Sequence, residues 1–154
     1  MNARTLRLFD EYAASHQHPT NRLTHKIAIP LIVFHILAML DWVRLPGGVL
    51  TLGMVFYAAT AVWYLRADVK LGLMVMALAA LSFPIGRMLP WWSVVALAVA
   101  AWGIQLAGHL VWEKKQPSFL HNMVHALVGP LFFVAVLTGA YRIDARRMQQ
   151  AQAA

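Results

Sequence analysis

Five long runs of apolar residues dominate this chain and limit the folds it can adopt. They cover residues 27–43, 48–65, 71–86, 91–112 and 123–141, with lengths of 17, 18, 16, 22 and 19 residues. A helix needs about 20 residues to cross the hydrocarbon layer of a bilayer, within a range of roughly 17–25. Because no run alternates polar and apolar residues as barrel strands do, the sequence predicts an all-α polytopic transmembrane bundle with about five membrane helices.

The composition excludes a water-soluble globule. Hydrophobic residues make up 60% of the 154 residues and charged residues 12%, whereas soluble domains average about 45–50% and about 25%. We therefore expect a single membrane domain over residues 1–154. Residues 1–26 are predicted to carry a short interfacial helix on the membrane surface, with a frayed tail as the alternative. Residues 27–141 would form the transmembrane helices, and residues 142–154 a basic and polar tail that we expect to be mobile.

The positive charge is spread along the predicted membrane margins. With five crossings, eight Lys and Arg residues lie on the N-terminal side and five on the other side. The positive-inside rule then places the N-terminal side in the cytoplasm. We expect an integral membrane protein, in the cytoplasmic membrane if bacterial and in the endoplasmic reticulum if eukaryotic, with any active site on the cytoplasmic face. The net charge of +7 is thus interpreted as orientation and contact with membrane lipids, and nucleic acid is not an expected partner.

Seven histidines and no cysteine mean that a metal site here must use nitrogen and oxygen ligands, which suit iron, zinc or manganese. Four crossings return the chain to its starting side at the end of the fourth run. Topology therefore gathers six histidines on that side: His16, His18, His25, His109, His121 and His125. Open-sided sets of histidine and carboxylate ligands are typical of ferrous iron in dioxygen chemistry. Such a set is available in His16, His25, His109 and Glu113.

Other interpretations of these residues stay open from the sequence. Histidines at a membrane surface can contact lipid head groups, and Glu113 with Lys114 can form an ordinary surface charge cluster. His35, in the middle of the first run, is expected to be a polar residue that finds a partner inside the bundle. A haem-binding protein would need histidine pairs that face each other. A non-enzymatic transporter or scaffold would need polar residues along a path through the bilayer.

Two short motifs lie beside expected membrane helices. The first is the segment 15–25, SHQHPTNRLTH, followed by Ile29-Pro30, and the second is the segment 105–109, QLAGH, followed by Glu113-Lys114 and Pro117. In this order they resemble the motifs of the 2-hydroxy fatty acid dioxygenase family, over roughly residues 5–140. The resemblance implies an iron(II)-dependent membrane enzyme that uses dioxygen to shorten 2-hydroxy fatty acids by one carbon, a step of α-oxidation.

The resemblance also implies roles for individual residues. The implied iron ligands are His16, His25 and His109, with His18, His121 and Glu113 as further candidates. His18 and His121 stand where the family more often has other polar residues. Glu113 and Asn21 also match the family pattern. We expect Glu113 to be a fourth ligand or the partner that orients His109, and Asn21 to hydrogen-bond substrate or ligand.

The substrate would need an anchor for its carboxylate and a groove for its acyl tail. Cationic side chains near the first motif and after the second are the expected carboxylate anchors. They are Arg22, Lys26 and Lys114. The groove can be lined by the Met-rich third run and by aromatic residues, namely Trp102, Trp112 and Phe119, although packing is the commoner role of such side chains.

Overall fold

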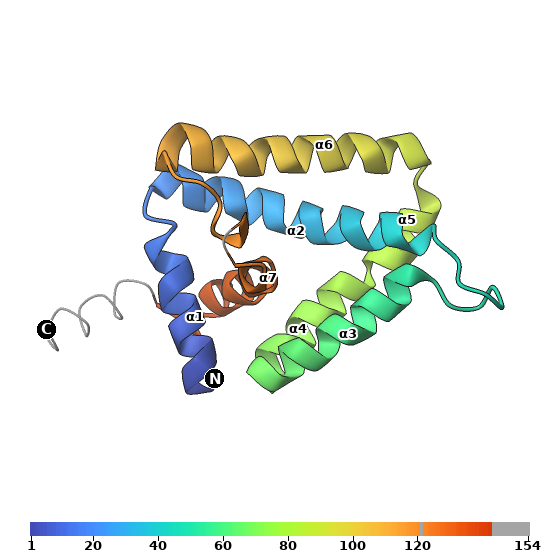
Figure 1. Ribbon diagram of the computed structural model, residues 1–154, viewed down its shortest axis with the longest axis horizontal. Helices are drawn as coiled ribbons and strands as arrows, with labels where there is room; N and C mark the ends of the chain where they lie inside the picture. The colour runs from blue at the N-terminus through green and yellow to red at the C-terminus, as the bar shows by residue number, and fades with distance from the viewer. Residues whose placement is uncertain (121, 143–154) are drawn as a thin grey trace, which may run out of the picture.

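The computed structural model describes residues 1–120 and 122–142, and turns and loops join the helices that these residues form (Figure 1). The helices are α1 (Ala3–Ala14), α2 (Pro19–Asp41), α3 (Leu52–Ala67), α4 (Val69–Ala80), α5 (Ser82–Met88), α6 (Trp91–Ala107), the π-helix η1 (Gly108–Glu113), the 3-10 helix η2 (Ser118–Leu120) and α7 (Val124–Leu137). The all-α prediction is confirmed. His121 and all but the first residue of the expected tail 142–154 lie outside the described residues.

Each of the five apolar runs is helical for most of its length, but the helices differ in reach. Three segments of the described chain are long and apolar enough to cross a membrane: Pro19–Asp41, Val69–Met88 and Trp91–Glu113. Helix α3 has 16 residues and α7 has 14, which gives lengths of about 24 and about 21 Å. Both fall short of the hydrocarbon layer, which is about 30 Å thick. Length and composition thus support three of the five expected crossings.

Two pairs of neighbouring helices build the body of the molecule. Helices α2 and α6 run antiparallel side by side, and α3 and α4 form a hairpin that leans against the far end of α2 (Figure 1). The hairpin turns at Asp68, whose carboxylate accepts a hydrogen bond from the Leu71 amide at 2.9 Å. A Cβ atom on Gly72 would lie 2.7 Å from the Tyr64 carbonyl oxygen, so only glycine permits this close approach of α3 and α4.

The third apolar run is broken where α4 gives way to α5. Pro84 lies in the first turn of α5 and has no amide hydrogen for the carbonyl of Ala80, the last residue of α4. The break lets the chain turn toward α6 after α4 has returned along α3. Proline is tolerated inside both α2 and α7, which continue through Pro30 and Pro130.

The N-terminal helix α1 packs against α7. Phe9 is fully buried, and its ring meets Phe132 edge-on with the ring centroids 5.4 Å apart, while Tyr12 is tilted against Phe132 at 4.9 Å. The helix expected near the N-terminus is therefore present. Its buried aromatic residues contact α7, because large aromatic residues on α7 offer a complementary surface.

The two ends of the α2–α6 pair are held differently. At the end of α2, the Asp41 carboxylate binds Arg87 with an Nε–Oδ2 distance of 2.7 Å and accepts a hydrogen bond from the Thr51 hydroxyl at 2.6 Å. The opposite end joins the start of α2, the end of α6 and the loop between α1 and α2. The candidate site lies at this second end.

Candidate metal centre and its two cavities

Three histidines from separate segments meet at the end of the bundle. His16 follows α1, His25 lies in the second turn of α2, and His109 lies in η1. The Nε2 atoms of His16 and His25 are 3.1 Å apart, and those of His25 and His109 are 3.0 Å apart. All three side chains are buried. The expected convergence of these residues, which are up to 93 positions apart in the sequence, is therefore confirmed.

Local sequence signals place the two N-terminal histidines. Helix α2 begins with Pro19 in its first turn, a position that suits proline because the first amides of a helix have no partner in the helix. His18 caps this helix, since its Nδ1 atom accepts a hydrogen bond from the Thr20 amide at 3.2 Å. Asn21 and His25 then lie four residues apart, on the same face of α2.

The π-helix η1 brings His109 to α2. A Cβ atom on Gly108 would lie 2.5 Å from Asn21 Oδ1 and would also collide with the Thr24 hydroxyl. Glycine at this position therefore allows the end of α6 to approach α2 closely. Short π-helical turns are rare and are frequent at functional sites.

Hydrogen bonds to backbone carbonyls fix which ring nitrogens carry hydrogen. Nδ1 of His16 donates to the Tyr12 carbonyl at 2.6 Å, and Nδ1 of His25 donates to the Asn21 carbonyl at 2.8 Å. A carbonyl oxygen only accepts, so in the neutral rings both Nε2 atoms carry lone pairs. Burial lowers the pKa of His16 to about 4, and this ring is neutral at pH 7. Two lone pairs thus face each other across 3.1 Å.

A bound cation accounts for the positions of these Nε2 atoms better than hydrogen bonds between the rings do. His109 Nδ1 has no hydrogen-bond partner among the described residues, so its Nε2 can carry a hydrogen and donate to His25. That bond would still leave the lone pairs of His16 and His25 opposed. Two imidazoles bound to one metal ion at about 2.1 Å and at right angles place their nitrogens about 3.0 Å apart. The two observed separations, 3.0 and 3.1 Å, match this spacing.

Glu113 joins η1 to the loop before α2. Its Oε1 atom accepts a hydrogen bond from the Gln17 amide at 2.9 Å. Its Oε2 atom accepts from the His18 amide at 2.9 Å and from Asn21 Nδ2 at 3.0 Å. Both oxygens are therefore engaged with the segment that carries His16. These three hydrogen bonds, which we call the bracket, hold the loop beside the three histidines. The Nε2 atoms of the histidines lie close together, and the group that they form does not include a Glu113 oxygen.

The remaining histidines have other surroundings. Nδ1 of His35 donates to the Leu31 carbonyl at 2.9 Å, and its Nε2 accepts from the Trp102 indole at 3.2 Å. The expectation that His35 finds a partner inside the bundle is confirmed. His125 has its Nε2 atom 3.4 Å from Glu11 and a buried Nδ1 atom without a partner among the described residues. Thus His18 and His125 lie outside the group formed by the three histidines.

Gln105 is a site residue that the sequence analysis did not single out. Its side chain is buried, and its Nε2 atom lies 2.7 Å from Nε2 of His25. Its Oε1 atom has no hydrogen-bond partner in the described part of the chain. The available signal was spacing, since Gln105 precedes His109 by four residues and shares its helix face. A polar amide thus adjoins the three histidines from the α6 side.

Two cavities reach the histidines. The first has a volume of about 330 Å³ and is mostly apolar; it extends from His16, Gln105 and His109 between α2, α7 and the α3–α4 hairpin. The second, of about 300 Å³, is lined by His16, His25 and the apolar residues Phe132 and Phe133, and it also contains Arg22 and Lys26. Tyr12, His16 and Ile29 line both. The histidines therefore stand between an apolar cavity and a cavity with two cationic side chains.

The other residues that were expected to contact the substrate differ in whether they line a cavity. Trp102 and Phe119 line the first cavity, whereas Trp112 is not among the described residues that line it. Lys114 is exposed and adopts a left-handed backbone conformation, with a φ of 54°, at the end of η1. It lines neither cavity in the described structure, in contrast to Arg22 and Lys26.

Comparison with known proteins identifies a family and one relative that are similar to this chain. The family described as "2-hydroxy-palmitic acid dioxygenase Mpo1-like" matches residues 3–141. The chain is 27% identical over 126 residues to the 2-hydroxy-palmitic acid dioxygenase MPO1 of Saccharomyces cerevisiae, and this alignment covers 80% of the chain and 72% of the yeast protein. No solved structure matches the chain.

Proposed function

Because the chain belongs to the Mpo1-like family of 2-hydroxy-palmitic acid dioxygenases, we propose that it shortens 2-hydroxy fatty acids by one carbon with iron(II) held by His16, His25 and His109. The observation that carries the proposal is the set of three buried imidazoles whose Nε2 atoms converge at the end of an apolar cavity. Bound iron(II) supplies the redox chemistry that dioxygen requires, and three protein ligands leave coordination positions open.

The charges around the site favour an acidic substrate. Three neutral imidazoles contribute no negative charge to balance a divalent ion. Arg22 and Lys26 line the cavity on the side of His16 and His25, and they can bind a carboxylate. A substrate with its carboxylate in this cavity and its tail in the apolar cavity would have its C1–C2 bond beside His16, which borders both. This is the bond that must break for the chain to lose one carbon.

Glu113 and Asn21 serve this site as positioning residues. Glu113 holds the amides of Gln17 and His18 and so fixes the loop that carries His16. The backbone carbonyl of Asn21 fixes the ring of His25, and its side chain ties α2 to Glu113. Carboxylates that surround a metal site also keep the ligating imidazoles in the correct orientation.

The site lies at the membrane surface in this proposal. His25 is six residues from the start of one span and His109 is four residues from the end of another, which corresponds to depths of about 9 and about 6 Å along the helices. An amphipathic substrate can thus keep its head at the interface while its tail remains among apolar side chains. We assign this end to the cytoplasmic face from the distribution of Lys and Arg.

The test is a combined metal and product measurement on the purified protein in detergent. After loading with iron(II) under anaerobic conditions, the protein should bind iron. With dioxygen it should convert 2-hydroxypalmitate to pentadecanoic acid, measured by mass spectrometry. Single replacement of His16, His25 or His109 by alanine should abolish both iron binding and product, whereas His18→Ala should keep both. Iron-loaded protein that forms no shortened acid would refute the proposal, as would a Soret band in place of bound iron.

A further inference from the structure

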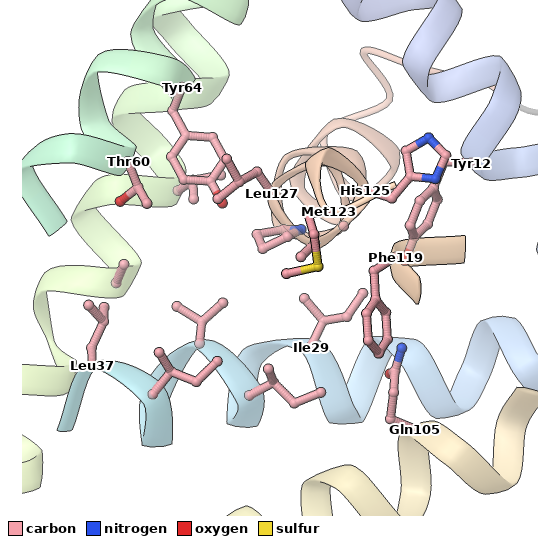
Figure 2. A pocket seen from close by; sticks show the side chains of 18 of the residues that line it. Tyr12, Ile29, Leu37, Thr60, Tyr64, Gln105, Phe119, Met123, His125 and Leu127 are labelled. Atoms are coloured by element: carbon pink, nitrogen blue, oxygen red, sulfur yellow. The ribbon is translucent and has the colours of Figure 1, made fainter. Parts of the chain in front are cut away.

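The apolar cavity has a polar end at the histidines and a far end at the α3–α4 hairpin. Figure 2 shows Gln105, Phe119 and His125 at one end, and Leu37, Thr60 and Tyr64 at the other. The lining between the two ends is mostly aliphatic. The imidazole and amide groups thus lie at one end, the hydroxyl groups of Thr60 and Tyr64 lie at the other, and the aliphatic stretch between them suits the tail of a fatty acid.

The length of this cavity can be measured along α2, which forms one of its walls. Five lining residues of α2 face it between positions 29 and 37, namely Ile29, Ile32, Val33, Ile36 and Leu37. From His25 to Leu37 the helix advances by twelve residues, which corresponds to about 18 Å. An extended hydrocarbon chain advances about 1.25 Å per carbon, given bonds of about 1.52 Å and angles near 111°. A hydrocarbon tail that starts beside His25 would thus reach the far end of the cavity after about 14 carbons.

The far end is formed by the α3–α4 hairpin and α2 together. Leu37 and Tyr64 are buried, with exposed fractions of 4% and 5%, and Met76 and Ala79 complete this end from α4. Thr60 lies between Leu37 and Tyr64 as a small side chain whose hydroxyl bonds only the Tyr57 carbonyl within its own helix among the hydrogen bonds of the described chain. A larger residue at position 60 would therefore shorten the cavity without removing a bond between helices.

We propose that Leu37, Thr60 and Tyr64 form the wall that sets the acyl chain length which the enzyme accepts. This inference rests on the proposed function for the identity of the ligand. The polar end fixes the carboxylate and the hydroxyl, so the methyl end of the tail must stop at this wall. Chains longer than the cavity would have to expel methylenes, and shorter chains would leave part of the apolar lining without contact.

Two substitutions at the wall have opposite expected effects, and a third serves as control. Thr60→Phe fills the far end and should move the preferred chain length shorter by about two to four carbons. Leu37→Ala removes three carbon atoms from the wall and should move it longer by about two. The matched control is Ala59→Phe, because Ala59 is the neighbouring residue on the same helix and is exposed. It should leave the profile unchanged.

The experiment measures binding and turnover separately. Unlabelled 2-hydroxy acids with 10 to 20 carbons would displace a fluorescent fatty acid from the purified protein, and the same series would be assayed for shortened product. In Thr60→Phe, each methylene excluded from the cavity should weaken binding about fourfold relative to the unmodified protein. Circular dichroism and elution as a single species would establish that each variant is folded.

The outcomes separate this inference from the proposed function. Opposite shifts in the binding profiles of Thr60→Phe and Leu37→Ala support the wall, even if no variant yields a shortened acid, and in that case only the proposed reaction fails. If the unmodified protein forms the product but Thr60→Phe shows the same chain-length profile as Ala59→Phe, the wall assignment is wrong. The assignment is also overturned if folded Leu37→Ala and Thr60→Phe shift the profile in the same direction.

Discussion

Glu113→Gln tests whether Glu113 supports the three histidines or binds the metal itself. Glutamine keeps the size of the side chain but presents one oxygen and one NH2 group. The two carboxylate oxygens accept hydrogen bonds from the Gln17 amide on one side and from the His18 amide and Asn21 on the other. Whichever way the glutamine turns, its NH2 group faces at least one donor. At least one bond to the loop before α2 is therefore lost.

The magnitude follows from the number and exposure of these bonds. A hydrogen bond to a charged acceptor contributes about 1.5–3 kcal/mol, and partial exposure of Glu113 to solvent reduces this contribution. We expect the free energy of unfolding of the metal-free protein to fall by about 1–3 kcal/mol. Because the bracket also orients His16, iron affinity should fall by roughly 10–100-fold, as is typical when a residue that orients metal ligands is replaced.

The assay compares thermal unfolding of the metal-free protein with iron(II) affinity from competition with a chelator of known affinity. Glu11→Gln is the matched control, because the Glu11 side chain is 58% exposed and its carboxylate lies 3.4 Å from His125. It should change neither quantity appreciably. If Glu113→Gln melts and binds iron like the unmodified protein, the bracket is refuted. If stability is unchanged but iron binding is lost completely, Glu113 is a ligand and our assignment of its role is wrong.

Three further predictions concern the same end of the molecule. Gly108→Ala should destabilise the protein by about 1–3 kcal/mol and weaken iron binding, because its Cβ atom would meet Asn21 Oδ1 at 2.5 Å; chemical denaturation of the metal-free protein checks this, and unchanged stability would contradict the close packing. Arg22→Gln should raise KM for 2-hydroxypalmitate roughly tenfold, since charge-assisted bonds are worth about 1.5–3 kcal/mol, whereas Lys114→Gln should not. Equal effects of the two substitutions would show that lining the cavity does not decide which cationic side chain binds the carboxylate. Removal of iron by a chelator should lower Tm. The stabilisation that is lost is about 2.7 kcal/mol if free iron was at 100 times Kd before its removal. The same treatment of His109→Ala should give no shift in Tm.

The meeting of the three histidines could be predicted because it depends on the parity of helix passes. His25 lies near the start of α2 and His109 lies just after the end of α6, so an even number of passes must bring them to the same end. This holds even though α3 and α7 are too short to span a bilayer, since the α3–α4 hairpin leaves and returns to the far end of α2 (Figure 1). The prediction therefore survives an error in the number of crossings only where the number of passes between His25 and His109 stays even.

The contacts inside the site could not be predicted in the same way. Glu113 was expected to be a metal ligand or the partner that orients His109, and its hydrogen bonds to the Gln17 and His18 amides depend on the position of the loop before α2, which the sequence pattern does not give. Lys114 looked equivalent to Lys26 by charge and by distance from a motif. Lys114 adopts a left-handed backbone conformation and lines neither cavity in the described structure, and backbone conformation of this kind is decided by local packing.

The role of Gln105 depends on tertiary structure as well. A single amide in an apolar helix is compatible with many environments, and only the approach of α6 to α2 places it 2.7 Å from His25. The break between α4 and α5 at Pro84 is a further example, because α2 and α7 continue through Pro30 and Pro130, so proline alone does not decide where a helix ends. Residues whose placement follows from the order of helices along the chain are thus predictable, and residues whose effect depends on packing are not.

The presence of two cavities on either side of His16 has a consequence for the fate of the products. In the proposed reaction the one-carbon fragment is small, whereas the shortened acid keeps its entire tail. The fragment forms on the side of Arg22 and Lys26, and the acid remains among the aliphatic residues of the other cavity. The two cavities thus offer each product its own space, and we expect the slower departure to be that of the shortened acid, which must withdraw its tail from the bundle.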